Sequence, residues 1–391
     1  MISIIVLPFF SIITGMWNRI VVNKSIIHLS LLVLRVWVFQ YILLSNKILR
    51  GSIFIILCVR LLRIVFVFFV CQKSLTFYVF FELRLIPTLL MVFFFGYQPE
   101  KLQARIYLLM YTVFSSLPLL LIFIRNNLYL RFINHQFIIW YVFVMTFGFR
   151  VKTPLYLVHV WLPKAHVEAP VAGSIVLAGI LLKLGSYGFI IFCPVFKNII
   201  LICYVYLSIL GAIYCSFICL RNYDIKSLIA YRSVVHMGVV TVGVIIGNEI
   251  GYKCALMIVI AHGVCSPFLF SLAFFLYSST HSRVISCNKG SVSVPIMVGL
   301  SFVLLAINIG VPPSINVWSE VFIFFALLEV MKFSIFFLLL VAFLGVVYNL
   351  FLYIRVSQRK ESFFLKIDSV IWPYLNSVFL RFGLFLMVNF F

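Results

Sequence analysis

The chain has 391 residues, of which 65% are hydrophobic and only 10% are charged. A soluble domain carries about a quarter charged residues, so this composition excludes a water-covered surface and indicates that lipid is the solvent. The formal net charge of +21 would suggest nucleic acid in a soluble protein. We expect no nucleic acid here, because Lys and Arg gather at the surfaces of membrane proteins. No long polar stretch interrupts the sequence, which predicts a single transmembrane domain over residues 1–391.

Apolar segments follow one another along the whole chain and predict an all-α, polytopic bundle of about 13–14 helices. A spanning helix needs about 20 apolar residues, and only helices satisfy their own backbone groups in lipid without closing a barrel. We expect N-terminal helices in 1–74, a first channel half in 75–192, a second in 193–355 and a C-terminal helix in 356–391. The apolar segments are 1–22, 26–44, 52–72, 75–96, 103–124, 137–157, 170–192, 198–219, 226–247, 253–277, 294–310, 318–355 with a break, and 370–391.

Two proline-containing passages interrupt this pattern at membrane depth. They are Lys152-Thr153-Pro154 and Gly310-Val311-Pro312-Pro313. Because of the second passage, residues 294–328 could be either two helices or a single interrupted helix. Proline removes a helix hydrogen bond and clashes with the preceding turn. Paired broken helices often mark an ion path in transporters, although a lone proline also kinks ordinary membrane helices. Each break here lies within eight residues of an intramembrane charge, which favours the ion path.

Six titratable residues lie inside or beside apolar segments, where ionisable groups are costly and usually functional. Apolar burial favours the uncharged form of acids and bases alike, so such groups can exchange protons near neutral pH. No spacing typical of a metal site or a catalytic nucleophile competes with this reading. The six predict a proton relay, and in chain order they are Glu82, Lys152, Lys183, His236, His262 and Glu320.

Structural roles remain open for each of these residues. Glu82 could pair with nearby Arg84, and Lys152 could be a positive anchor at a helix end. Lys183 could extend its amine to a membrane surface, and the two histidines could be hydrogen-bonded packing residues. Glu329 also lies at membrane depth, but we favour a surface role for it because Lys332 is near.

The sequence predicts no cofactor bound to this chain. It contains neither GxGxxG nor a P-loop, so we expect the chain itself to bind neither NADH nor ATP. Nine Cys are scattered through apolar segments without a CxxC pair. Iron–sulfur and zinc sites need clustered thiolates, so these Cys are interpreted as ordinary buried residues.

Five passages carry a resemblance to a known family, and it extends over about residues 75 to 355. The two most specific passages are VKTPLYLVHVWLPKAHVEAPVAGS at 151–174 and LAGILLKLGSYG at 177–188. The others are YQPEKLQA at 97–104, DIKSLIAY at 224–231 and VPPSIN at 311–316. Together they resemble the antiporter-like membrane subunits of respiratory complex I, NADH:ubiquinone oxidoreductase, in its mitochondrial form.

The resemblance implies two inverted-topology repeats of five helices, each with one broken helix. It also implies that the positions of the proton relay in this family correspond to the six titratable residues named above. Electron transfer from NADH to ubiquinone would then occur in other subunits, while this chain moves protons across the mitochondrial inner membrane. Its partners would be the other membrane-arm subunits of complex I and the membrane lipids, and it would hold no redox cofactor.

Two other classes of function remain open. One is a subunit of a multisubunit cation/proton antiporter, which shares the family's acid and lysine positions. The passage at 97–104, the short length and the Phe-rich composition favour the mitochondrial subunit. The other is a membrane scaffold with inactive channels, in which neutralising the buried charges would have no effect.

Several arginines depart from the family pattern. Arg84, Arg105 and Arg232 stand where the family usually has small residues such as Ser or Gly, and nine acids cannot pair every Arg. Arg35, Arg60 and Arg63 also lie in or beside apolar segments. Either these residues are genuine and meet acids of neighbouring subunits, or some are translation artefacts, since many invertebrate mitochondria read AGA and AGG as Ser or Gly. We hypothesise that Arg84, Arg105 and Arg232 are Ser or Gly in the native protein.

Overall fold

The computed structural model of the chain describes most of the membrane bundle. The predicted helices over 1–22 and 370–391 lie outside the described residues, as does all of 26–44 except Val38. Arg35 is also outside them. The described residues are 38, 52–71, 73–96, 101–126, 139–192, 200–290, 295–312 and 314–357.

Five membrane segments make up the first half of the described bundle. The second segment divides in two at Arg84, the fourth is broken, and the fifth contains a π-helical turn. The helices are α3 (Ser52–Val70), α4 (Ser74–Leu83), α5 (Leu85–Phe95), α6 (Lys101–Asn126), α7 (Ile139–Lys152), α8 (Trp161–Glu168), α9 (Val171–Val176), η2 (Leu177–Leu181) and α10 (Leu182–Phe192).

Five further segments make up the second half, and again the fourth is broken. The break predicted within 318–355 falls after Val330 and separates the fourth segment from the fifth. Residues 295–330 form one interrupted segment. The helices are α11 (Ile200–Arg221), α12 (Ile225–Ile246), α13 (Glu249–Thr280), α14 (Pro295–Ile309), α15 (Ile315–Val330) and α16 (Ser334–Ser357).

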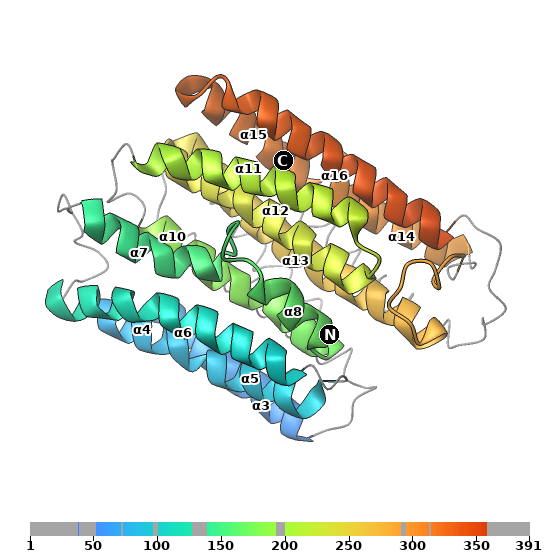
Figure 1. Ribbon diagram of the computed structural model, residues 1–391, viewed down its shortest axis with the longest axis horizontal. Coiled ribbons are helices and arrows are strands. Elements are labelled where there is room, and N and C mark those ends of the chain that lie inside the picture. The colour runs from blue at the N-terminus through green and yellow to red at the C-terminus, as the bar shows by residue number, and fades with distance from the viewer. Residues whose placement is uncertain are drawn as a thin grey trace, which may run out of the picture.

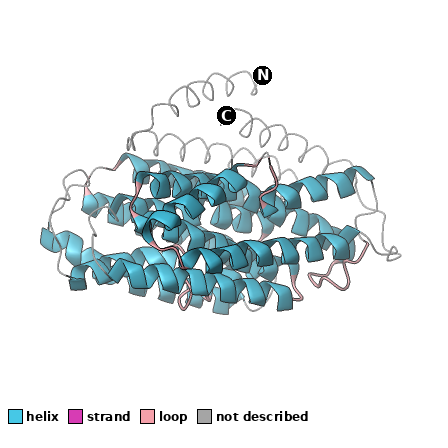
Figure 2. Ribbon diagram, turned by 90° about the horizontal axis from the view of Figure 1, so that it is seen from above, coloured by secondary structure: helices cyan, strands magenta, loops and turns pink. Residues whose placement is uncertain are grey.

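The helices lie side by side in one bundle (Figures 1 and 2). Within the described ranges, eight unbroken segments are long and apolar enough to cross a membrane, and the two broken segments complete the pattern of ten. This confirms an all-α, polytopic membrane protein. The inverted relation between the two halves stays a prediction.

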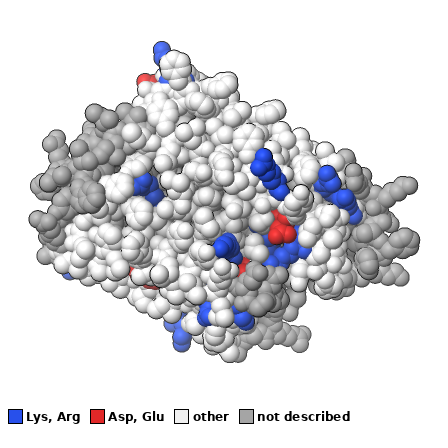
Figure 3. Space-filling view, in the orientation of Figure 1, with Lys and Arg blue, Asp and Glu red and all other residues white. Residues whose placement is uncertain are grey.

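Burial separates an inner from an outer set of helices. In the segment 171–192 and in α13, 94% of the residues in the most apolar window are buried inside the protein, whereas in α16 only 33% are. The outer helices expose large apolar side chains such as Phe114 on α6 and Phe336 on α16. The face drawn in Figure 3 accordingly shows mostly uncharged side chains with a few scattered charges. Such a surface suits lipid or neighbouring membrane helices.

The first break follows directly from its sequence. Helix α7 ends at Lys152, and Pro154 cannot supply an amide hydrogen to continue it. The chain then turns into α8, a short helix that the hydropathy pattern did not predict. Gly185 of α10 lies so close to the break that an added Cβ would be 2.9 Å from the carbonyl carbon of Lys152. Glycine therefore lets the inner helix pack against the broken one.

The second break depends on Gly310. Its φ of +91° ends α14 in the left-handed region, which glycine adopts without steric cost. Pro312 prevents an immediate restart, and Ser314 takes the N-cap position of α15. Glu320 consequently lies in the second turn after the break, beside an interrupted backbone.

Candidate functional site

Glu82 and Lys152 form a closed ion pair in the first half. The Lys152 Nζ donates to Glu82 Oε1 at 2.5 Å, joining α4 to the end of α7 at the break. The Lys152 side chain is 3% exposed, so it does not serve as a surface anchor, and the Glu82 side chain is 20% exposed. The sequence selected both residues, and the structure brings them together.

Aromatic rings surround this pair. The Lys152 Nζ lies 3.3 Å from the centroid of the Phe81 ring, which attracts a cation through its negative face. Phe81 also packs against Phe68, Phe77 and Phe149, and these three rings are buried. The pair therefore has few polar neighbours that could replace either partner, and separating it would leave a charge in apolar surroundings.

Lys183 lies at the centre of the bundle and contacts His262. Its Nζ is 2.7 Å from His262 Nδ1 and donates to the carbonyl of Ala178 at 2.6 Å. Lys183 is 2% exposed, so its amine does not reach a membrane surface. The π-helical turn η2 directly precedes it, and π turns commonly occur at functional sites. The carbonyl that accepts from Lys183 belongs to that turn.

His236 continues the line of polar groups from His262. The two imidazole rings lie 5.6 Å apart between centroids, on α12 and α13. One turn earlier, Arg232 Nη2 contacts His236 Nε2 at 3.2 Å and donates to the carbonyl of Asn308 at 2.5 Å. Arg232 and His236 are therefore in direct contact.

A cavity of about 40 Å³ lies next to Arg232 and reaches Glu320. This volume holds more than one water molecule, and polar groups around it can bind them. The Glu320 carboxylate makes no hydrogen bond or ion pair with the described part of the chain. The polar residues on the cavity wall are Arg232, His236, Asn308, Glu320, Tyr348 and Asn349.

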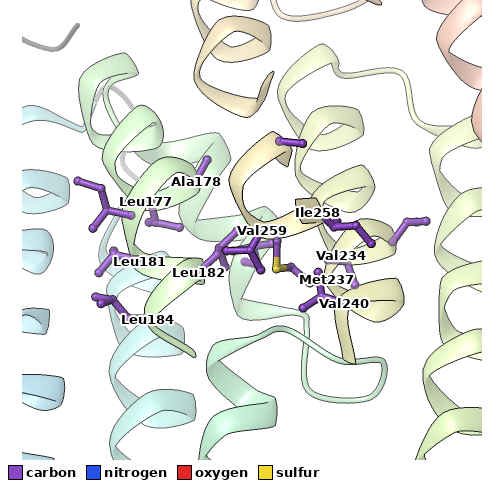
Figure 4. Close-up of a cluster of buried hydrophobic side chains, with 14 of the residues drawn as sticks. Leu177, Ala178, Leu181, Leu182, Leu184, Val234, Met237, Val240, Ile258 and Val259 are labelled. Carbon is purple, nitrogen blue, oxygen red and sulfur yellow. The ribbon is translucent and has the colours of Figure 1, made fainter. Parts of the chain in front are cut away.

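The six predicted residues thus form two groups rather than one unbroken chain. Glu82 and Lys152 make one group, whereas Lys183 and the residues on α12, α13 and α15 make the other. Within the described residues, no side-chain contact joins Lys152 to Lys183. Apolar side chains pack between the π turn and helices α12 and α13, where Figure 4 shows Leu182, Val259 and Met237 close together.

The three arginines that depart from the family pattern have no carboxylate partner within the described ranges. Arg84 is 2% exposed and donates to the carbonyls of Phe81 and Leu181. Arg105 lies over the ring of Phe93, and its Nε is buried without a partner. Arg232 has two such nitrogens, Nε and Nη1. Buried donors without partners are costly, so Arg105 and Arg232 fit their surroundings poorly.

The remaining predictions on single charges have mixed outcomes. Arg60 and Arg63 are exposed on α3, where they can meet lipid or another subunit. Glu329 is exposed and accepts from the Asn248 side chain at 2.6 Å, which confirms its surface position. Glu82 pairs with Lys152 and not with Arg84.

Sequence reasoning missed two buried groups near the broken segment. Arg150 donates to Tyr204 Oη at 3.0 Å and lies over the Tyr204 ring. Arg150 is on α7 and Tyr204 on α11, so the sequence gives no local sign of this contact. His166 is fully buried on α8, and neither ring nitrogen has a hydrogen-bond partner. Its only sequence signal was its position inside a passage used for the resemblance.

A bundle with two broken segments and a buried line of amine, imidazole and carboxyl groups defines an ion-translocating membrane subunit. The family model described as NADH:quinone oxidoreductase/Mrp antiporter, transmembrane, matches residues 72–347. Two solved structures share the fold. The chain is 25% identical, with a TM-score of 0.81, to a chain of respiratory complex I from Thermus thermophilus with bound NADH, covering 93% of this chain and 81% of that one. It is 15% identical, with a TM-score of 0.79, to a chain of the Mrp complex from Dietzia, covering 89% and 68%.

Curated relatives narrow this class. The chain is 37% identical to NADH-ubiquinone oxidoreductase chain 4 of Rhipicephalus sanguineus, over 86% of this chain and 80% of the relative. It is 39% identical to the protein of the same name from Lumbricus terrestris, over 85% and 78%. The chain belongs to the chain 4 family of NADH-ubiquinone oxidoreductase.

Proposed function

We propose that this chain is a proton-translocating membrane subunit of NADH-ubiquinone oxidoreductase. Its relay would consist of Glu82, Lys152, Lys183, His262, His236 and Glu320. The observation that carries the proposal is the contact of Lys183 with His262 at the centre of the bundle. A buried amine bonded to an imidazole is suited to proton exchange.

Each contact in the central group suits a proton-transfer step. Lys183 can pass a proton to the imidazole of His262, and the nearby ring of His236 can receive it directly or through one water. Water in the cavity can carry the proton on to Glu320. The Glu320 carboxylate would accept the proton and release it on the side of α15 away from the cavity.

The Glu82–Lys152 pair would act on this group as an electrostatic gate. While the pair is closed, its charges largely cancel. Opening the pair would leave the Lys152 ammonium uncompensated in a poorly screened interior, which disfavours a proton on Lys183. A change in a neighbouring subunit that opens the pair would therefore drive a proton out of Lys183.

The relatives' names place them in an enzyme that oxidises NADH and reduces ubiquinone. We propose that this chain works in the same setting, with other subunits of that enzyme as its partners and the mitochondrial inner membrane as its location. The electron carriers would belong to those partners, because the sequence predicts no cofactor in this chain.

A cation/proton antiporter subunit is the alternative function, supported by the fold of the Mrp chain. That structure is 15% identical to this chain, against 36–41% for curated chain 4 relatives. A cation path would also need several oxygen ligands around the central group. The contacts of Lys183 are one carbonyl and one imidazole, which favour proton transfer.

The substitution Lys183→Met tests the proposed function. It removes the titratable amine and keeps an unbranched apolar side chain of similar length, so the complex should assemble normally. We expect loss of the protons that this chain moves, measured as protons translocated per NADH oxidised in vesicles containing the complex. Lys183→Arg should also pump poorly, because guanidinium rarely releases its proton. A normal proton-to-electron ratio in Lys183→Met would exclude the proposed relay and favour a scaffold.

A further inference from the structure

The break between α14 and α15 leaves backbone carbonyls that helical hydrogen bonds cannot satisfy. The last four carbonyls of a helix have no partner within that helix. The Ala306 carbonyl accepts from the amides of Gly310 and Val311 at 3.2 and 3.0 Å, in the turn that ends α14. The next carbonyl, that of Ile307, accepts from the side-chain amide of Asn316 at 3.2 Å. A side chain beyond the break therefore completes the end of the helix before it.

The bond from Asn316 joins the start of α15 to the last turn of α14. Asn316 lies in the first turn of α15 and is 3% exposed, and its bond to Ile307 spans nine positions of the chain. Glu320 follows four residues later on the same face, because residues i and i+4 of a helix lie one above the other. The bond thus fixes the helical turn from which the Glu320 side chain projects.

The Glu320 carboxylate lies beside the same break. Its Oε2 is 3.6 Å from the position that a Cβ added at Gly310 would occupy. The cavity wall includes both Asn308 and Glu320. Asn308 is held by α16, because its side-chain amide donates to Asn349 Oδ1 at 3.4 Å. The end of α14 is therefore anchored to an outer helix, and it offers α15 a fixed point of attachment.

The first break contains a bond of the same kind. The Val151 carbonyl, in the last turn of α7, accepts from the Trp161 indole at 3.0 Å. Trp161 begins α8, ten positions further along the chain. In both halves, a side-chain donor from the first turn after the break binds a carbonyl in the last turn before it. The same arrangement at two different local sequences indicates that each break is held in a defined geometry.

We infer that Asn316 is a positioning residue for Glu320, which it holds at the cavity by bonding the first turn of α15 to the end of α14. This inference rests on the proposed function and adds to it the residue that orients the acid. While the bond is made, the carboxylate stays beside the cavity, where water can deliver a proton. Without the bond, the buried Ile307 carbonyl loses its partner, and α15 is free to turn the carboxylate away from the cavity.

The test replaces Asn316 by Leu, which has a similar size and no hydrogen-bond donor. We expect Asn316→Leu to assemble and to oxidise NADH, but to lose as much of the proton-to-electron ratio as Glu320→Gln does. Combining the two substitutions should cause no further loss, because both act on one acid. The infrared carboxyl band that Glu320→Gln removes should be shifted in Asn316→Leu, since the acid would leave the water of the cavity.

Asn288→Leu is the matched control. Asn288 is also buried, and its side-chain amide donates to the carbonyls of Ser282 and Val284. It lies in the loop after α13 and is not part of the cavity wall. Its replacement removes a buried amide of the same kind, and it should leave both the ratio and the Glu320 band unchanged.

A second variant, Asn316→Ser, keeps the position polar, but its side chain is too short to reach Ile307. It should therefore lose the ratio as Asn316→Leu does. A normal ratio or an unshifted band in Asn316→Leu would show that the bond only completes the helix end, and failure of both variants to assemble would assign Asn316 to folding. Either result overturns the inference. Normal pumping by Lys183→Met would instead remove the proposed function itself.

Discussion

The two halves of the bundle carry opposite charges on corresponding segments, and these charges have different surroundings in each half. In the first half, the broken segment carries the base Lys152 and the second segment the acid Glu82, and the two are in contact. In the second half, the broken segment carries the acid Glu320 and the second segment carries Arg232. There the guanidinium bonds to a backbone carbonyl, and a cavity lies beside it and the carboxylate.

This difference shows two ways to keep a charge inside a membrane. The first half neutralises the charge with a partner and surrounds the pair with aromatic rings. The second half leaves space for water, which solvates a carboxylate without fixing its protonation state. A closed pair suits a gate, whereas a hydrated acid suits the transfer and release of protons. The predictions below test this contrast.

Glu82→Gln should have the largest effect, because it leaves the buried Lys152 ammonium without a partner. Removing one member of a buried pair costs about 3–5 kcal/mol. We expect less assembled complex and lower activity, measured by native gel electrophoresis and NADH oxidation. The double variant Glu82→Gln with Lys152→Met removes both charges, so it should recover assembly but not proton pumping. Strictly additive losses of stability in the two single variants and the double variant would contradict the contact.

Glu320 should respond differently to the same kind of change. Glu320→Gln leaves no partner stranded, so assembly should stay near normal while proton pumping is lost. Glu320→Asp keeps a titratable acid beside the cavity and should retain part of the pumping. The measurement is the proton-to-electron ratio of the two variants in vesicles. Equal ratios would make Glu320 a structural polar residue and remove the contrast with Glu82.

The sequence predicted the fold class and both breaks because these depend on local signals. Runs of about 20 apolar residues define spanning helices, and the prolines at 154 and 312 mark where helices stop. The six candidate residues were selected from the sequence because a charge inside an apolar segment is conspicuous, and their role as a relay stays a prediction. Their grouping could not be predicted, because the contact of Lys183 with His262 joins residues 79 positions apart.

Other parts of the site depend on packing that no local pattern encodes. The π turn before Lys183 lies in an ordinary apolar run, and α8 lies in a passage too short and polar to predict a membrane segment. The partnership of Arg150 with Tyr204 requires α7 to lie against α11. His166 carried no signal of its own, because a histidine is noteworthy only once its burial and its lack of partners are known.

Gly185→Ala should disturb the first half by a smaller amount. The added Cβ would lie 2.9 Å from the backbone of Lys152 and the same distance from the methyl carbon of Thr153, so α10 must move away from the break. Overpacking of this kind costs about 1–3 kcal/mol. We expect a lower midpoint in thermal denaturation of the purified complex. Gly299→Ala is the control, because nothing lies within 4 Å of its added Cβ; an equal shift in both variants would show that the close approach is not what matters.

The last prediction concerns which residue the native protein has at position 232, and its test needs no substitution. The Arg232 guanidinium contacts His236, where a fixed positive charge opposes protonation of the imidazole, and two of its nitrogens are buried without partners. A Ser or Gly at this position would remove both problems and enlarge the cavity toward His236, which would improve the path to Glu320. We therefore expect mass spectrometry of the native subunit to find Ser or Gly at position 232, and likewise at Arg84 and Arg105.

Arg150 is the internal control for this measurement. Its guanidinium is buried to a similar degree and its Nε also lacks a partner, but its Nη2 donates to Thr146 and Tyr204 and the group lies over the Tyr204 ring, so neighbouring side chains hold it in place. We expect a peptide with Arg at position 150 in the same digest. A native peptide with Arg at position 232 would refute the recoding hypothesis. The second half would then need a carboxylate near its guanidinium, and Glu320 across the cavity is the acid of this chain positioned to supply it.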